Sequence, residues 1–277
     1  MISVIIATKN EEKNIARLLE SIKNQNYKDI EVIVVDNNST DKTIQISKTY
    51  TNKVFLKGPE RSVQRNFGVS KAKGKYVLIL DGDMELTPNV LKNVLENLGE
   101  NKAMVIPERT VGTGFMASVR KFEREMYMGD PTVEVARFFE KKVFEEFEGY
   151  DPNLTGAEDY DLPKRISDKY SIGRSSEYIL HHETGLTLSK QLQKKFYYAQ
   201  KSALYAQKHP DLISKQGILI WRKAYIRHWK KFITNPLMGI ALLFTRTLET
   251  IAATLGFIKA VGIIGFFKTV IQMFKHL

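Results

Sequence analysis

Three short apolar runs, each followed at once by polar residues, constrain the fold of this chain most. The runs are residues 2–7, 30–35 and 76–80. Segments with apolar residues at helical spacing separate them, and strands that alternate with helices predict a doubly wound α/β domain with a mostly parallel sheet. Ligands of such sheets bind beyond the carboxyl ends of the strands. We therefore expect one crevice to collect the polar clusters at 8–10, 36–41 and 81–83.

Composition excludes several kinds of site. The 277 residues suffice for one α/β domain with an appendage, and 43% hydrophobic residues can form a substantial core. The absence of cysteine excludes disulfides, thiolate metal sites and cysteine nucleophiles. The N-terminal apolar run has no basic segment before it and no small-residue cleavage site after it. We therefore expect a buried strand there rather than a signal peptide.

The net charge of +11 is concentrated in one part of the chain. Residues 190–231 contain eleven Lys and Arg and a single acid, whereas residues 1–189 contain 27 basic and 29 acidic residues. We therefore expect a near-neutral domain at 1–210 and a basic, apolar tail at 211–277 whose partner is anionic. We do not expect nucleic acid as that partner. The aromatic and basic residues around 196–198 nevertheless keep a nucleic-acid-binding protein as the lowest-ranked alternative.

Asp81-Gly82-Asp83 is the first motif that could carry chemistry. It follows a buried strand directly, where two uncompensated acids would be costly. A bound hard cation such as Mg²⁺ or Mn²⁺ would compensate the charge of both carboxylates and can also coordinate a diphosphate. An ordinary Asp-Gly turn is the alternative, and the motif alone favours neither.

Two further pairs could complete such a site. Glu158 and Asp159 stand at a predicted helix start, where a carboxylate is stabilised by the helix dipole or can serve as a general base for an acceptor hydroxyl. His181 and His182 follow a short strand-like stretch, so their side chains point to opposite faces and only one can easily face the crevice. A neutral imidazole there would add a metal ligand, with a structural histidine as the alternative.

Arg61 and Arg65 lie four residues apart on a predicted helix and therefore share a face. Two guanidinium groups on one face can bind phosphate in bidentate fashion. A solvated basic helix face is the alternative, and this pair alone does not exclude it.

Together these motifs resemble those of glycosyltransferase family 2, which consists of inverting enzymes with the GT-A fold. The resemblance runs from residue 2 to about 205 and rests on five motifs in the same order: 4–11, 34–41, 65–68, 81–83 and 155–162. It implies a nucleotide-diphosphate sugar as the donor substrate. The residues that it assigns to the donor are Ala7, Thr8, Asn10, Glu11, Asp36, Asn38, Arg65, Asp81 and Gly82.

The resemblance also implies the catalytic roles. Asp83 and His182, or His181 in its place, would bind Mn²⁺ or Mg²⁺. Asp159 would be the catalytic base. Polyprenyl-phosphate sugar synthases of the same fold attack with an anionic phosphate and need no base. The intact Glu158-Asp159 pair therefore favours a hydroxyl acceptor, which we expect to be a lipid-linked saccharide, with a polyprenyl-phosphate glycosyl synthase as the alternative.

The C-terminal 46 residues, 232–277, are apolar, but their longest run without charge has 14 residues, short of the about 20 that usually span a bilayer. An apolar stripe at helical spacing consists of Leu237, Ala241, Phe244, Leu248, Ile251 and Leu255. The other side carries Arg246, Glu249, Thr250 and Thr254. This pattern predicts an amphipathic helix that lies in a membrane interface.

We expect this helix to hold the protein at the cytoplasmic face of the cell membrane, as a peripheral or monotopic protein. The basic residues before the helix would bind anionic lipid, and Trp221 and Trp229 would lie at headgroup level. Gly262 and Gly265 are expected to break or bend the segment. An ordinary helical subdomain, a dimer interface and a re-entrant hairpin are the alternatives.

Overall fold

The computed structural model describes residues 1–209 and 222–275. The chain forms two compact units, which we call the sheet unit and the helical unit. The sheet unit comprises Met1–Arg109, Val135–Pro152 and Glu158–His182. The helical unit comprises Thr110–Glu134, Asn153–Ala157 and, as far as it is described, Glu183–Leu277. The predicted boundary at residues 210 and 211, and Trp221 near it, lie outside the described residues, so that division stays a prediction.

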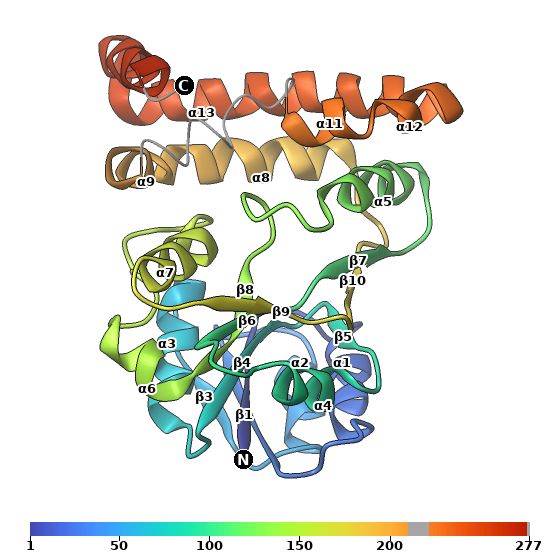
Figure 1. Cartoon of the computed structure of the whole chain (residues 1–277), viewed down its shortest axis with the longest axis vertical. Coiled ribbons are helices and arrows are strands. Elements are labelled where there is room, and N and C mark those ends of the chain that lie inside the picture. The colour runs from blue at the N-terminus through green and yellow to red at the C-terminus, as the bar shows by residue number, and fades with distance from the viewer. Residues whose placement is uncertain (210–221, 276–277) are drawn as a thin grey trace. The chain divides into compact units, whose positions relative to one another are not determined.

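The sheet unit is built on a mixed, mostly parallel sheet of seven strands, in the order β3-β2-β1-β4-β8-β6-β9 (Figure 1). The strands are β1 (Ile2–Thr8), β2 (Ile30–Asp36), β3 (Val54–Leu56), β4 (Tyr76–Asp81), β6 (Ala103–Val105), β8 (Ala136–Glu140) and β9 (Ile172–Arg174). Strand β8 runs antiparallel to both of its neighbours, and the other pairs are parallel. The predicted α/β class with a mostly parallel sheet is confirmed.

A smaller sheet and the helices complete the two units. The smaller sheet has the order β5-β10-β7, with β5 (Met84–Leu86), β7 (Glu108–Val111) and β10 (Ile179–His182). The helices of the sheet unit are α1 (Ile15–Lys23), α2 (Thr43–Lys48), α3 (Arg61–Lys71), α4 (Val90–Glu96), α6 (Lys141–Glu146) and α7 (Glu158–Ser167). Those of the helical unit are α5 (Phe115–Tyr127), α8 (Leu188–Lys201), α9 (Ala203–Lys208), α11 (Lys223–Arg227), α12 (Trp229–Thr234) and α13 (Pro236–Lys275).

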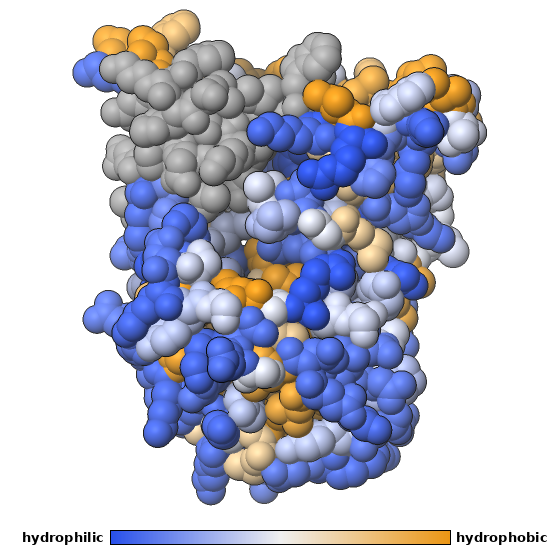
Figure 2. Space-filling view, in the orientation of Figure 1, coloured by the Kyte–Doolittle hydropathy of each residue, from blue (hydrophilic) through white to orange (hydrophobic). Residues whose placement is uncertain are grey.

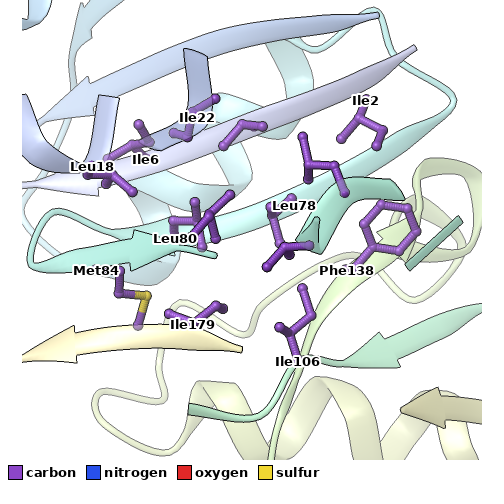
Figure 3. Close-up of a cluster of buried hydrophobic side chains, with 14 of the residues drawn as sticks. Ile2, Ile6, Leu18, Ile22, Leu78, Leu80, Met84, Ile106, Phe138 and Ile179 are labelled. Carbon is purple, nitrogen blue, oxygen red and sulfur yellow. The ribbon is translucent and has the colours of Figure 1, made fainter. Parts of the chain in front are cut away.

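Strand β1 shows why the apolar runs form the centre of the sheet. All seven of its residues are buried, as expected for a strand that helices cover on both faces. Ile2 and Ile6 point into one core, which includes residues of α1 and α4 (Figure 3). Ile5 points into a second core, to which α3, α6 and α7 contribute. Alternate side chains of one strand thus hold both helical layers on the sheet.

The pairing of β1 with its neighbours brings the predicted polar clusters to one edge of the sheet. Thr8 lies opposite Asp36 at the end of β2, and Ala7 lies opposite Asp81 at the end of β4. These strands are parallel, so their carboxyl ends share an edge, which is where ligands of such sheets bind. The candidate site therefore begins at the ends of β1, β2 and β4.

Helix α13 packs against α8 in the helical unit. A Cβ atom on Gly256 would lie 2.2 Å from the backbone oxygen of Phe196, so only glycine permits this approach. Gly262 interrupts α13 with φ 73° and ψ 168°, which confirms the break predicted there, whereas Gly265 continues the helix. By length and composition, Pro236–Ile271 could cross a membrane: its 18-residue apolar window has a mean hydropathy of 1.8, and 6% of that window is buried.

Helix α13 exposes a row of large apolar side chains and buries charged ones beside Leu242. The exposed large hydrophobic residues of α13 are Leu237, Ile240, Leu243, Phe244, Ile251, Leu255, Ile263, Ile264, Phe267 and Ile271. Arg246 and Glu249 are instead buried, and Arg246 forms ion pairs with Glu249 and with Glu123 of α5. Figure 2 shows hydrophobic surface where α12 lies and at the C-terminal end of α13. Surface helices of water-soluble domains show the opposite arrangement.

Candidate active site

Arg65 of α3 lies at the centre of the site and is fully buried. Its Nη2 donates to Asp81 Oδ1 at 2.7 Å, and its Nη1 donates to Asp159 Oδ1 at 2.6 Å. The same Nη1 donates to Glu158 Oε1 at 3.3 Å. One guanidinium group thus joins the acid at the end of β4 to the two acids at the start of α7. Arg65 therefore belongs to the site and not to a solvated helix face.

The charges of this cluster shift two pKa values in opposite directions. Burial alone would raise the pKa of Asp81, but Arg65 and two further arginines outweigh burial and hold that pKa well below its usual range. Burial and the Asp159 carboxylate raise the pKa of Glu158, in part against the effect of Arg65. Asp81 is therefore ionised at neutral pH, and Glu158 binds a proton more readily than an ordinary glutamate.

The second predicted acid of the motif, Asp83, lies beside a histidine. Its Oδ2 is 3.2 Å from Nε2 of His181, whose Nδ1 is 3.0 Å from Glu108 Oε2. Burial alone would lower the pKa of His181, but the hydrogen bonds to these two carboxylates outweigh burial and raise it to about 9. His182, the histidine first predicted as a ligand, instead places its Nε2 2.7 Å from Glu85 Oε2. The imidazole next to the Asp83 carboxylate is therefore that of His181.

The separation of Asp83 Oδ2 and His181 Nε2 fits a shared metal ion. An octahedral ion at about 2.1 Å from its ligands holds neighbouring ligand atoms about 3 Å apart, close to the observed 3.2 Å. Within residues 1–209 and 222–275 there is no group of three or more His, Asp or Glu that could hold a metal. Mg²⁺ and Mn²⁺ commonly take one or two protein ligands together with substrate phosphates and water. The two side chains therefore fit an ion that a diphosphate completes, once His181 has lost its proton.

The loops after β1 and β2 are joined by hydrogen bonds. The backbone NH of Asn10 donates to Ser39 Oγ at 2.7 Å, and Asn10 Oδ1 accepts from the backbone NH of Thr40 at 2.9 Å. Asp36 is fully buried and accepts from the backbone NH of Ser39 at 2.6 Å. Asn10 and Asn38 have φ of 54° and 51°, which asparagine adopts more readily than most residues. The predicted nucleotide residues Asn10 and Asp36 thus help to hold these two loops in place, and Asn38 lies in the second loop.

Gly82 allows the first loop to approach the acidic motif. A Cβ atom there would lie 2.8 Å from Glu11 Cγ and 2.9 Å from Thr8 Oγ1. Burial and the carboxylates of Asp83 and Asp81 raise the pKa of Glu11. The predicted donor residues Thr8, Glu11 and Gly82 therefore lie next to the two aspartates.

Two residues of the candidate site, Glu108 and Arg137, were not predicted from the sequence. Arg137 of β8 is buried, and its Nη2 lies 2.7 Å from Glu108 Oε1. Its Nη1 is 3.7 Å from Asp81 Oδ2. Neither residue belongs to a motif, but Arg137 is a charged residue within an apolar strand, and a charge there is rarely buried without a partner. That signal alone would have marked Arg137.

Comparison with known proteins identifies the family. The profile described as Glycosyl transferase family 2 matches residues 3–150. The poly(ribitol-phosphate) beta-N-acetylglucosaminyltransferase TarS of Staphylococcus aureus is 36% identical over 115 residues, which cover 38% of this chain and 20% of TarS. The uncharacterized glycosyltransferase MJ1057 of Methanocaldococcus jannaschii is 28% identical over 236 residues, 76% of this chain and 81% of that protein. The matched segment thus spans about a fifth of TarS but most of MJ1057.

Solved structures share the fold at low sequence identity. The crystal structure of Staphylococcus aureus TarS 1-349 has a TM-score of 0.56 at 19% identity and covers 100% of this chain and 92% of its own. The mannosyltransferase PcManGT from Pyrobaculum calidifontis, in complex with GDP-Man and Mn²⁺, has a TM-score of 0.57 at 18% identity, with 99% and 86% coverage. With the family profile matching more than half of its residues, and with this fold, the chain belongs to glycosyltransferase family 2.

Proposed function

We propose that this protein transfers a sugar from a nucleotide-diphosphate donor to a hydroxyl group of an acceptor, with inversion at the anomeric carbon. The observation that carries the proposal is the buried guanidinium of Arg65, which contacts both Asp81 and Asp159. Both acids contact the same guanidinium group, so the donor-side acid Asp81 and the candidate base Asp159 lie close together. A substrate bound between them could contact both carboxylates.

We assign different steps of this reaction to different residues of the sheet unit. The loops around Asn10 and Asp36 would bind the nucleotide, and Asp81 would contact the ribose or the donor sugar. Asp83 and His181 would hold Mn²⁺ or Mg²⁺, an ion that when bound neutralises charge on a diphosphate. The nucleotide-sugar donor is supported by structural relatives in complex with UDP-GlcNAc and with GDP-Man.

Asp159 would act as the general base. Its carboxylate is 21% exposed, whereas its partner Arg65 is not exposed at all, so a substrate can reach the acid but not the arginine. As the acceptor oxygen bonds to the anomeric carbon, its proton passes to Asp159, and the bond from that carbon to the diphosphate breaks on the opposite face. One such displacement inverts the configuration.

A lipid-linked saccharide is the acceptor that we propose. One relative, from Campylobacter jejuni, is named as the GalNAc(5)-diNAcBac-PP-undecaprenol beta-1,3-glucosyltransferase; it is 32% identical over 114 residues, 38% of this chain and 36% of that enzyme. A phosphate acceptor, as in a polyprenyl-phosphate glycosyl synthase, would need no base such as Asp159. Product analysis for a phosphodiester-linked sugar distinguishes the two.

We also propose that the protein works at a membrane surface, at the cytoplasmic face, with α13 in the plane of the interface. The apolar face of α13 is exposed, and its polar face is already occupied by ion pairs within the helical unit. A helix that uses one face to pack on α8 and α5 cannot be surrounded by lipid on all sides, so in-plane docking is favoured over spanning. Exposed cations, Lys223, Arg227 and Lys230, suit anionic lipid.

Replacement of the base tests the reaction. We expect Asp159→Asn to lower kcat about 10²–10⁴-fold, because a positioned base contributes that much, while donor affinity changes little. Release of nucleoside diphosphate from a panel of nucleotide sugars with Mn²⁺ provides the assay. Asp168→Asn is the matched control, because Asp168 lies nine residues after Asp159, just past the end of α7, and is exposed with Lys164 as its partner. Unchanged turnover in Asp159→Asn would rule out this base.

A further inference from the structure

Five charged side chains of the sheet unit form a continuous series of contacts. Asp81 faces Arg137 at 3.7 Å, and Arg137 faces Glu108 at 2.7 Å. Glu108 contacts His181 at 3.0 Å, and His181 contacts Asp83 at 3.2 Å. The series starts at Asp81 and ends at Asp83, the two aspartates of the acidic motif. Its other members come from β7, β8 and β10, so three separate strands fix its geometry.

Glu108 divides its two oxygen atoms between the neighbours. Its Oε1 accepts from Arg137 Nε at 2.8 Å and Nη2 at 2.7 Å, which holds the carboxylate in one orientation. Its Oε2 faces Nδ1 of His181. A carboxylate at one imidazole nitrogen keeps a proton there and leaves the other nitrogen available as a ligand. The available nitrogen, Nε2, is the one beside Asp83.

We propose that Glu108 is a positioning residue for His181, which it holds with Nδ1 protonated and Nε2 directed at the metal, and that Arg137 fixes Glu108 in turn. The inference rests on the proposed function, because it requires that Asp83 and His181 hold the metal. It adds two residues that no motif of the sequence marks. Outer contacts of this kind orient a ligand and raise its basicity, and their loss typically weakens metal binding 10–100-fold.

The neighbouring residue provides a matched control within the same strand. His182 also contacts a carboxylate, Glu85, at 2.7 Å, so the two pairs have the same chemistry. Adjacent residues of a strand point to opposite faces, so only the His181 pair adjoins Asp83. If His182 were the ligand, the effects of the two carboxylates on metal binding would be exchanged.

Manganese binding to the full-length protein tests the inference without an activity assay. Titration of free Mn²⁺ by electron paramagnetic resonance should show a 10–100-fold weaker Kd for Glu108→Gln and an unchanged Kd for Glu85→Gln. Arg137→Gln should weaken binding less, because it leaves the contact between Glu108 and His181 in place. An unchanged Kd in Glu108→Gln, or an equal loss in Glu85→Gln, would overturn the inference.

Two further measurements separate the possible failures. If Asp83→Asn abolishes Mn²⁺ binding while Glu108→Gln does not alter it, the metal site stands and the inference falls. If the wild type binds no Mn²⁺ even with a nucleoside diphosphate present, both fall. Should Glu108→Gln fail to fold, ¹⁵N spectra of the wild type with Zn²⁺ in place of paramagnetic Mn²⁺ still decide. They should show His181 protonated at Nδ1, and protonation at Nε2 would overturn the inference.

Discussion

Arg65 lies on a helix with other polar residues, but it is the residue that joins the acids of the candidate site. It is fully buried and contacts three carboxylates. Removal of one partner from a buried ionic cluster leaves the other charges without compensation, which typically costs about 3–5 kcal/mol. Arg65 therefore holds these carboxylates in place, and loss of activity in an Arg65 variant would not by itself identify a chemical step.

Glu31 offers a test of stability away from the site. It lies at the start of β2, accepts from the backbone NH of Gly74 at 3.1 Å and pairs with Lys53. Burial would raise its pKa, but hydrogen bonds from Lys53, Ser3 and the backbone of residue 73 outweigh burial and lower the pKa to about 2. Its pKa in the unfolded chain is higher, so the stabilisation is present above about pH 4.5 and is lost as the pH falls toward 2.

We therefore expect Glu31→Gln to reduce the dependence of the free energy of unfolding on pH in the acid range. Between pH 6 and 2.5, the free energy of unfolding from urea titration should fall less steeply in the variant than in the wild type, and the two should converge at the acid end. Glu100→Gln, at an exposed position after α4, serves as the control. Parallel curves for Glu31→Gln and the wild type would contradict the assignment.

The sequence marks those site residues that stand in compact motifs. Two pairs of acids stand close together in the sequence at the end of a strand or the start of a helix: Asp81 with Asp83, and Glu158 with Asp159. Two carboxylates so close repel each other, and a bound cation or a catalytic role would account for them. Glu108 and Arg137, by contrast, are single residues in short strands that only tertiary packing brings together. The choice between His181 and His182 likewise depends on the register in which β10 pairs with β5, because that register decides which histidine lies beside Asp83, and side-chain alternation alone cannot give it.

At the scale of elements, the strongest apolar runs are the most predictable. The runs at 2–7, 30–35 and 76–80 form the centre of the sheet, because continuous β-branched and apolar residues suit strands buried on both faces. The direction of β8 could not be read from its residues, since pairing direction follows from the connections and not from composition. The spacing of apolar residues in α13 predicted an apolar and a polar face, but not which of the two packs against the rest of the helical unit.

The contact between α13 and α8 depends on Gly256. In Gly256→Ala the new Cβ would meet the backbone oxygen of Phe196 at 2.2 Å, so the helices must separate. We expect a cost of about 1–3 kcal/mol, more than alanine gains within a helix. Amide hydrogen exchange in α8 and α13 of the full-length protein should accelerate accordingly, by about 5–150-fold.

The control for this variant is Gly265→Ala. Its Cβ would meet only Val261 of the same helix, at 3.0 Å, and a side chain can adjust where a backbone cannot. Exchange in α8 should therefore stay as in the wild type. Equal acceleration in both variants would show that glycine at 256 is not required for close packing.

At the scale of the whole molecule, the two units draw on interleaved segments of the chain. The helical unit takes in Thr110–Glu134 and Asn153–Ala157 as well as the residues from Glu183 onward. Such interleaving leaves no mark in composition, because contacts between distant segments define the units. The charge distribution, in contrast, is a property of the sequence itself and can be obtained from it without a structure.

Membrane docking is testable with the whole protein. We expect the full-length chain to float with vesicles that contain phosphatidylglycerol, and less with phosphatidylcholine alone or at high salt. The double variant Phe244→Glu with Ile251→Glu should weaken partitioning at least about 100-fold, because each apolar side chain contributes about 1.5–3 kcal/mol when buried. Both positions are more than half exposed.

Leu56→Glu is the matched control, because Leu56 of β3 is 60% exposed but lies in the sheet unit. Its partitioning should equal that of the wild type. If the double variant floats normally but changes from dimer to monomer, the apolar face is a dimer interface. A gel shift with nucleic acid and no flotation would favour the lowest-ranked alternative.

The exposed apolar side chains of α13 also bear on how the proposed acceptor would be encountered. If α13 lies in the interface and the acceptor is anchored in the same leaflet, as proposed, both partners diffuse in two dimensions. The quantity that sets the encounter rate is then the number of acceptors per area of leaflet, and not their number per volume of solution. At saturating donor, turnover would then depend on the density of acceptors in the leaflet, and dilution of the surrounding medium would leave the encounter with the acceptor unchanged.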